Sequence, residues 1–278
     1  MMVATKKLNP SQNHQATSLT GLDKNWLQKV FPVLANWPDE AIAEHKAILM
    51  EAADHAWERC RFDRRNPVYT YREPTEKPGE FREATCSECF RKYKTEFKTL
   101  MREAGFPKRF LSLTLDQLDS RSKVQEYLEN FPALKEQGKG LLIAGNVGTG
   151  KTQLIVSLAV ELVKRYLVAA RFITCFDLLK LFKKALTDSW AASELTELQE
   201  AELVIIDDIG SSRLSEFDQA ELANFIDKRY QVIRPIVITT NLSKKDLAEF
   251  IGERSISRAG PLIMEIMPQK IRLSLICS

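Results

Sequence analysis

The strongest constraint on this chain is a short glycine-rich segment, residues 145–152, that lies between two apolar segments of different period. It reads Gly-Asn-Val-Gly-Thr-Gly-Lys-Thr and fits the pattern G-x-x-x-x-G-K-T. The run Leu141–Ala144 before it predicts a buried strand, and Gln153–Val163 after it predicts an amphipathic helix. Backbone N–H groups of such a loop, together with the positive end of the helix dipole, can surround phosphate groups. The segment therefore predicts a phosphate-binding loop within an α/β fold.

The residue types of this loop predict how it binds ATP or GTP together with Mg²⁺. Glycine lets the backbone adopt positive φ and approach the phosphates closely. We expect Lys151 to reach the β- and γ-phosphates and the Thr152 hydroxyl to ligate Mg²⁺. The alternative is a glycine-rich turn without function, which requires every fixed position of the pattern to be filled by chance. The expected nucleotide-binding residues are Gly145, Asn146, Val147, Gly148, Thr149, Gly150, Lys151 and Thr152.

Two further predicted strands end in polar residues. Leu203–Ile206 is followed by Asp207 and Asp208, and Ile236–Thr240 is followed by Asn241. Ligands bind at the carboxyl ends of parallel strands, so these side chains are expected at one edge of a sheet. We expect Asp207 to hold Mg²⁺ through its water shell, Asp208 to act as general base, and Asn241 to contact the γ-phosphate and the attacking water. Taken alone, an apolar strand ending in two aspartates also fits an ordinary turn.

The rest of the C-terminal half alternates between helical and strand patterns, which predicts a parallel sheet with flanking helices. Near its end, Arg254 and Arg258 are four residues apart and share one helical face. Paired guanidinium groups suit bidentate contacts with a phosphate of another subunit. Further helices are predicted at 120–137, 176–186, 215–230 and 243–250, and further strands at 170–174 and 262–266.

Composition limits the class of protein. The chain has 278 residues, which is room for two domains at about 150 residues each. Hydrophobic residues make up 44% and charged residues 28%, which excludes a wholly disordered or collagenous protein. A formal net charge of +3 allows a nucleic-acid partner without requiring one. No apolar run approaches the roughly 18 residues of a membrane helix, and no signal peptide is evident, so we expect a cytoplasmic protein without membrane contact.

The first 110 residues divide by composition into three segments. Residues 1–20 are polar, without an apolar period, and are expected to form a disordered leader. Residues 21–59 have apolar residues at helical spacing, and this helical region is either a packing module or a docking arm for a partner protein. Residues 60–110 are rich in Arg, Lys, Glu and Pro and are expected to form an irregular basic module or linker.

Zinc is one interpretation of the cysteines in the basic module. Cys86 and Cys89 form a C-x-x-C pair, which supplies half of a tetrahedral zinc site. Cys60 is the candidate third ligand, and Asp63 or His55 is the candidate fourth. The alternative is a loop without metal in which the thiols are incidental.

Nucleic-acid binding is a secondary interpretation of two segments in which basic and aromatic residues are mixed. Aromatic rings can stack on the bases of a single strand while Lys and Arg contact the phosphates. A run of charges is more often a solvated face, particularly where Glu is interleaved. The aromatic residues of the basic module are Phe81, Phe90, Tyr93 and Phe97, and the second group, in and after the helix predicted at 176–186, is Lys180, Lys183, Lys184 and Trp190.

Taken in order, GNVGTGKT, LVIIDD, ITTN and GERSISR resemble the AAA+ ATPases of the DnaC-type replicative helicase loader family, the IstB/DnaC-like ATP-binding proteins. The phrase AGFPKRF at 104–110 is similar to that family's lead-in to the adenine pocket, which a cysteine-rich zinc module often precedes. The resemblance implies ATP with Mg²⁺ and an AAA+ domain over 111–278 whose parallel sheet has the order 5-1-4-3-2. Arg258 resembles the arginine finger that reaches a neighbour's ATP, with Arg254 beside it, and Arg272 has the approximate place of the second sensor.

Two functions of different kinds follow from the resemblance, and a third is possible without it. The first is a loader whose N-terminal helices bind a replicative helicase while its ATPase domains self-associate, through the Arg258 finger, around single-stranded DNA. The alternative is an IstB-type helper ATPase that assembles on duplex DNA for a transposase. The third is a nucleotide-binding structural module without turnover.

Overall fold

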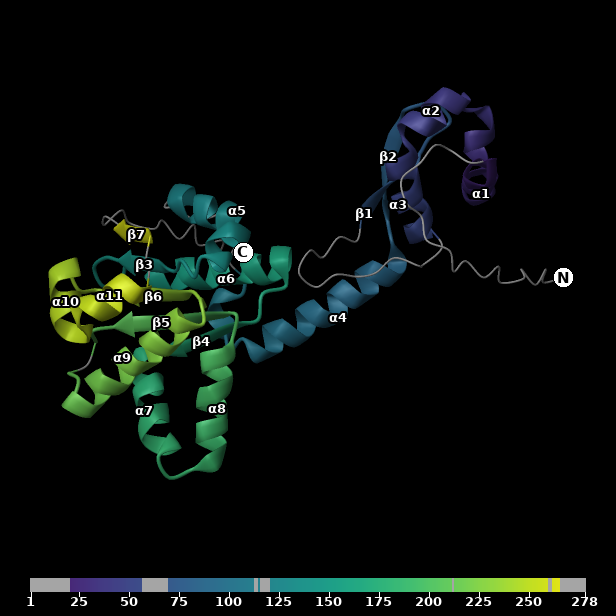
Figure 1. Cartoon of the computed structure of the whole chain (residues 1–278). Helices are drawn as coiled ribbons and strands as arrows, with labels where there is room; N and C mark the ends of the chain where they lie inside the picture. Colours follow the sequence, from purple (N-terminus) through teal and green to yellow (C-terminus); the bar gives the residue numbers. More distant parts are fainter. Residues whose placement is uncertain are drawn as a thin grey trace, which may run out of the picture. The chain divides into compact units, whose positions relative to one another are not determined.

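The computed structural model describes residues 21–56, 70–112, 115, 121–211, 213–259 and 262–265. These residues form two compact units, and the division falls between Arg91 and Lys92. We call residues 21–56 and 70–91 the N-terminal unit, and the described residues from 92 onward the C-terminal unit (Figure 1). The leader predicted at 1–20 and the candidate residues Cys60, Asp63 and Arg272 lie outside the described residues.

The N-terminal unit combines short helices with a two-stranded antiparallel sheet. Its helices are α1 (Gly21–Val30), a 3-10 helix η1 (Pro32–Asn36), α2 (Asp39–Glu44) and α3 (Lys46–Ala56). They are followed by the hairpin strands β1 (Thr70–Pro74) and β2 (Phe81–Thr85), and then by α4 (Ser87–Glu103). Helices are therefore confirmed for the described part of residues 21–59.

A hydrophobic core joins these helices to the hairpin. Leu27, Leu34, Ile42 and Leu49 are fully buried at its centre, and side chains of the two strands, including Phe81, pack against it. The indole N–H of Trp37 also donates to the Thr75 carbonyl, 3.0 Å away in the hairpin turn. The helices and the hairpin consequently belong to one packed unit rather than to two separate modules.

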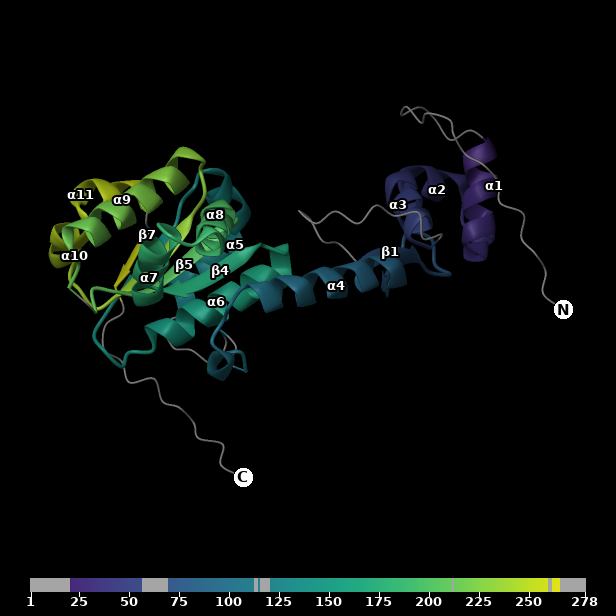
Figure 2. The same ribbon diagram turned by 90° about the horizontal axis from the view of Figure 1, so that it is seen from below.

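The expectation of an irregular module between residues 60 and 110 is wrong for its described part, which contains the hairpin and α4. The strands escape a hydrophobicity pattern because they are short and carry charged residues at their centres, where Glu73 and Arg82 form a cross-strand ion pair of 2.8 Å. Along α4 the buried residues Cys89, Tyr93 and Leu100 do recur at helical spacing, but charged residues fill the positions between them. Both views show α4 as one continuous helix across the division (Figures 1 and 2).

A five-stranded parallel sheet organises the C-terminal unit. Its strands are β3 (Leu141–Ala144), β4 (Ala170–Thr174), β5 (Leu203–Ile209), β6 (Ile236–Thr240) and β7 (Leu262–Glu265). They lie in the order β4-β5-β6-β3-β7. Numbered 1 to 5 along the chain and read from the β7 edge, this is 5-1-4-3-2, the order that the resemblance implies. All five strands coincide with predicted ones to within a few residues.

Helices flank this sheet. They are α5 (Arg121–Glu136), α6 (Lys151–Tyr166), α7 (Cys175–Ala185), α8 (Ser189–Glu200), α9 (Glu216–Gln231), α10 (Lys244–Ile251) and α11 (Glu253–Ala259), with a short 3-10 helix η2 (Lys108–Phe110) before α5. Of these, α8 was not predicted, and Trp190 lies within it. None of the helices in the described part of the chain is long and apolar enough to cross a membrane.

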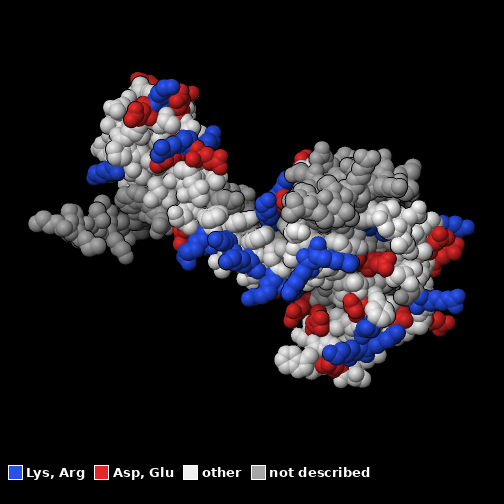
Figure 3. Space-filling model, turned by 180° about the vertical axis from the view of Figure 1, so that it is seen from behind, with Lys and Arg blue, Asp and Glu red and all other residues white. Residues whose placement is uncertain are grey.

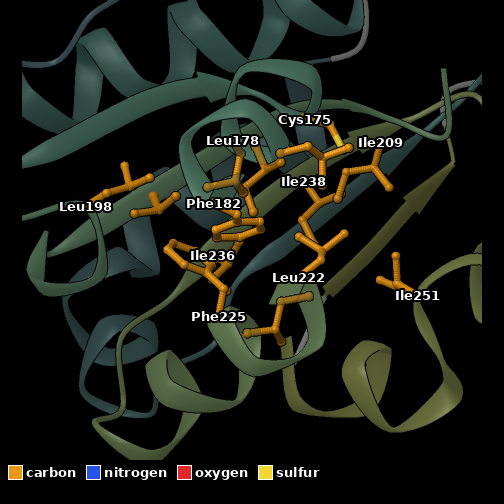
Figure 4. Packing of buried hydrophobic residues seen from close by; sticks show 14 of the residues in the cluster. Cys175, Leu178, Phe182, Leu198, Ile209, Leu222, Phe225, Ile236, Ile238 and Ile251 are labelled. Carbon is orange, nitrogen blue, oxygen red and sulfur yellow. The ribbon is translucent and has the colours of Figure 1, made fainter. Parts of the chain in front are cut away.

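The two faces of the sheet have separate cores. Val204 and Ile206 of β5 belong to a cluster with residues of α7, α8, α9 and α10 (Figure 4). Leu203 and Ile205 are equally buried but lie outside that cluster, because successive side chains of a strand point to opposite faces. Helix α6 contacts β5 and β6 with a row of buried residues, so the sheet is covered on both sides. This burial holds the carboxyl ends of the strands rigidly.

Candidate nucleotide-binding site

The phosphate-binding loop lies where it was predicted, between the end of β3 at Ala144 and the start of α6 at Lys151. Gly148 and Gly150 have φ values of +80° and +83°, which other residues rarely adopt. A Cβ at Gly148 would meet no heavy atom within 4 Å, so backbone conformation rather than crowding requires glycine there. The Gly145 N–H donates to the Thr240 carbonyl over 3.1 Å, which ties the loop to β6.

The Lys151 side chain folds back over this loop. Its ammonium donates to the carbonyls of Gly145 and Asn146 over 2.8 and 2.9 Å, and the residue is only 9% exposed. Burial lowers the pKa of Lys151, while the carboxylates of Asp208 and Asp207 oppose that shift. The Lys151 ammonium is therefore held inside a loop whose backbone conformation suits a bound phosphate.

Thr152 and Asp207 join the first turn of α6 to the end of β5. The Thr152 hydroxyl lies 3.1 and 3.0 Å from the two carboxylate oxygens of Asp207 and donates to that group. Hydroxyl and carboxylate oxygens are the ligands that Mg²⁺ prefers. These two residues fit a Mg²⁺ ion, which would neutralise phosphate charge when bound. The predicted ligands are thus adjacent although 55 positions separate them.

Asp208 occupies a different environment from its neighbour Asp207. It is exposed, whereas Asp207 is 6% exposed. The pairing of β5 with β6 shifts register between Ile206 and Ile209, and Asp208 has a φ of +62° inside that irregularity. The two adjacent carboxylates therefore differ in burial and in backbone conformation.

Asn241 and the two arginines lie on other parts of the C-terminal unit. Asn241 is exposed directly after β6, the strand between β3 and β5. Arg254 is exposed on α11. Arg258, also on α11, forms an ion pair with Asp227 of α9 and lies 5.8 Å from the centroid of the Tyr230 ring. Within this chain, the Arg258 guanidinium is thus already paired with a residue of α9.

A second group of chemically active side chains lies in the N-terminal unit. The ligand atoms of His55, Cys86 and Cys89 all lie within 4.8 Å of one another, and both cysteines are buried. The His55 ring stacks on Tyr71 at a centroid distance of 5.2 Å, which orients the imidazole. One histidine and two cysteines fit three positions of a tetrahedral zinc site. His55 thus lies with the C-x-x-C pair, while Cys60 and Asp63 are outside the described residues.

If this group binds zinc, purified protein should contain about one zinc ion per chain, and a chelator should lower the melting temperature by several degrees because the metal links α3 to α4. Cys86→Ser should lose the ion. Cys175→Ser is the matched control, since Cys175 is a buried cysteine outside the group. Metal-free wild type whose melting is unchanged by chelator would remove the zinc hypothesis.

The sequence and the fold of this chain are similar to those of known proteins. The family described as IstB-like ATP binding protein matches residues 88–261, which is more than half of the chain. The chain belongs to this family. The family region begins within α4, close to Lys92 where the C-terminal unit starts, and therefore before the boundary expected at residue 111.

Two relatives that this chain resembles have different descriptions. The replicative helicase loader DnaC of Escherichia coli (strain K12) is 27% identical over 144 residues, 51% of this chain and 57% of that protein. The insertion sequence IS232 putative ATP-binding protein of Bacillus thuringiensis subsp. berliner is 31% identical over 124 residues, 45% of this chain and 49% of that protein. The chain spans about half the length of these curated relatives.

A solved structure supports the same fold. The crystal structure of the DnaC helicase loader superposes with a TM-score of 0.53 at 26% sequence identity and covers 58% of this chain and 99% of that one. The fold is thus an α/β fold with a helix-flanked parallel sheet, as in an AAA+ domain. The region that matches the family, residues 88–261, includes the phosphate-binding loop. The ATP binding in the family's description and the site described above therefore concern the same part of the chain.

Proposed function

We propose that this protein is an oligomeric, ATP-hydrolysing switch that loads a replicative helicase onto single-stranded DNA. The observation that carries the ATPase part is the meeting of the phosphate-binding loop, Thr152 and Asp207 at one sheet edge, with Asp208 beside them. In this proposal Lys151 contacts the phosphates, Thr152 and Asp207 hold Mg²⁺, and Asp208 takes a proton from the attacking water. Asn241 orients that water, and a neighbour's Arg258 supplies positive charge.

The N-terminal unit supports the loader in preference to an ATPase domain acting alone. It has its own hydrophobic core, of which Leu27, Leu34 and Leu49 are fully buried members, and the candidate metal group. A separately packed unit can grip a partner protein while the ATPase domain changes its assembly state with bound nucleotide. We therefore assign helicase binding to this unit and the ATP switch to the other.

Single-stranded DNA fits the exposed surface of α7 and α8. Phe176 and Trp190 are 52% and 85% exposed, and the Lys180 ammonium lies 4.0 Å from the centroid of the Phe176 ring. Lys183 and Lys184 are also exposed on α7, although they pair with Asp218 and Asp188. Exposed rings beside cations suit stacked bases and phosphates. By contrast Tyr93, counted among the stacking candidates, is buried, and its hydroxyl donates to the Lys164 carbonyl over 2.8 Å.

Helix α4 offers a second basic surface. Lys94, Lys98 and Arg102 are exposed and spaced four residues apart, so they form one row along the helix. Figure 3 shows Lys and Arg side chains gathered on this face of the molecule, with Asp and Glu more scattered. The row adds electrostatic attraction for any nucleic acid but does not distinguish single strands from duplex.

The alternative function is that of a transposase helper acting on duplex DNA. The similarity to the IS232 ATP-binding protein favours it, since that relative has the higher identity of the two described above. The same ATP site serves either function, because both need nucleotide-dependent assembly. Only the partner protein and the form of DNA separate them.

A co-purification experiment with the full chain tests the choice. With ATP, we expect the protein to bind a replicative helicase of its source organism and to place that helicase on circular single-stranded DNA. Lys151→Ala is expected to lose loading because its subunits do not bind ATP. If the wild type ignores the helicase but binds duplex DNA with ATP and stimulates a transposase, the loader proposal is wrong and the helper is correct.

A further inference from the structure

Thr239 makes two hydrogen bonds that involve both aspartates of the candidate site. It lies on β6, next to β5, and is 1% exposed. Its hydroxyl donates to Asp207 Oδ1 over 2.6 Å and accepts from the Asp208 N–H over 2.8 Å. A hydroxyl has one proton, so the bond accepted from the backbone leaves that proton for the carboxylate. The Thr239 hydroxyl thus acts as a donor toward Asp207 and as an acceptor toward Asp208.

The bond to Asp208 lies where the sheet is irregular. Asp208 has a left-handed φ of +62°, a conformation that is unfavourable for residues other than glycine and that surrounding contacts must maintain. The register shift between Ile206 and Ile209 removes regular pairing with β6 at this point. Thr239 supplies a partner for the Asp208 N–H there, so its hydroxyl replaces a bond of the regular ladder.

The bond to Asp207 fixes a buried carboxylate from a second direction. Thr152 donates to Asp207 from α6, and Thr239 donates to it from β6. Two hydroxyl donors on separate elements therefore fix the orientation of the Asp207 carboxylate. Residues that orient a metal ligand typically change metal affinity or activity about 10–100-fold when they are removed.

We propose that Thr239 is the positioning residue that separates the roles of the two aspartates. It holds Asp207 toward the Mg²⁺ position and holds the backbone of Asp208 in the conformation that turns this carboxylate into the exposed part of the site. In this proposal Thr239 acts through its hydrogen bonds to the two aspartates. The inference rests on the proposed ATPase chemistry but not on the proposed helicase or DNA partners.

The test replaces Thr239 in the full-length protein. Thr239→Val keeps the shape and removes the hydroxyl, and we expect kcat for ATP hydrolysis to fall about 10–100-fold. KM for ATP should change less than about threefold, and the Mg²⁺ concentration for half-maximal rate should rise. Thr239→Ser keeps the hydroxyl and should restore kcat to within about threefold of wild type. An active, folded Val variant with wild-type kcat and Mg²⁺ dependence would overturn the inference.

A second pair of variants covers the case in which Thr239→Val does not fold. Thr239→Ser and Thr239→Ala both lose the methyl group and differ only in the hydroxyl, so the ratio of their kcat values isolates it. Equal kcat values in this pair overturn the inference. If the wild type hydrolyses ATP but loads no helicase, the loader proposal fails while the Ser-to-Ala ratio still decides the role of Thr239. If the wild type does not hydrolyse ATP, the Mg²⁺ dependence of ATP binding in the same pair decides it.

Discussion

Replacing Lys151 with alanine is expected to abolish ATP binding at concentrations that saturate the wild type. The Lys151 ammonium lies inside the loop against the Gly145 and Asn146 carbonyls, within the loop that would surround the phosphates. Hydrogen bonds to charged groups contribute roughly 1.5–3 kcal/mol each. Because 1.4 kcal/mol is a factor of ten in Kd, losing contacts to two phosphates predicts binding at least about 100-fold weaker.

Equilibrium binding of a fluorescent ATP analogue measures this effect, and thermal melting shows whether the variant is folded. Lys164→Ala is the matched control, because Lys164 is a lysine of the same helix whose side chain is 59% exposed and pairs with Glu161. This control should bind ATP as the wild type does. A folded Lys151→Ala protein with unchanged affinity and unchanged hydrolysis would mean that the nucleotide site has been misassigned.

Replacing Arg258 with alanine is expected to spare ATP binding by isolated subunits and to lower assembly-dependent hydrolysis by about 10³-fold or more, the effect known for arginine fingers. The guanidinium is paired with Asp227 of its own subunit. A neighbour's γ-phosphate therefore has to replace Asp227 as the partner of Arg258 when subunits assemble. Hydrolysis measured against protein concentration, at saturating ATP, reports this contribution.

Mixing two inactive variants gives a sharper test of action in trans. Lys151→Ala subunits lack ATP but keep Arg258, whereas Arg258→Ala subunits bind ATP but lack the finger. In a mixed assembly, the first can supply its arginine to the second, so hydrolysis should partly return. Asp227→Asn is the control for loss of the ion pair, and it should retain assembly-dependent hydrolysis. Full activity of Arg258→Ala alone, or no recovery on mixing with intact assembly, would exclude the finger.

Local patterns predicted the nucleotide loop and the elements around it well. Leu141–Ala144, Ala170–Thr174 and Ile236–Thr240 coincide with β3, β4 and β6 because short apolar runs bounded by loop residues leave few alternatives. The helix predicted at 215–230 corresponds to α9, and Ser215 and Asp218 form a capping box at its start. Each of these features depends only on residues within a few positions of one another.

The hairpin, α4 and α8 were not predicted. The hairpin and α4 are held by charged pairs, an aromatic cluster and widely spaced buried residues, so their average composition is that of a linker. The N-cap residue before α8 is Asp188, whose side chain accepts from the Trp190 N–H. This capping signal was not recognised in the sequence. Packing against the rest of the fold, rather than local hydrophobicity, stabilises these segments.

The sequence alone determined the phosphate-binding loop and the alternating strands and helices, because glycine conformation and hydrophobic period act locally. It also predicted that Asp207 belongs with Lys151 and Thr152, because the carboxyl ends of parallel strands lie at one edge of a sheet. Tertiary structure alone decided which distant groups meet. His55 lies with Cys86 and Cys89, Arg258 pairs with Asp227, and the Thr239 hydroxyl bonds both Asp207 and the backbone of Asp208. Such contacts join residues about 30 positions apart, and those of Thr239 also depend on strand order and on a register shift, so they leave no local pattern.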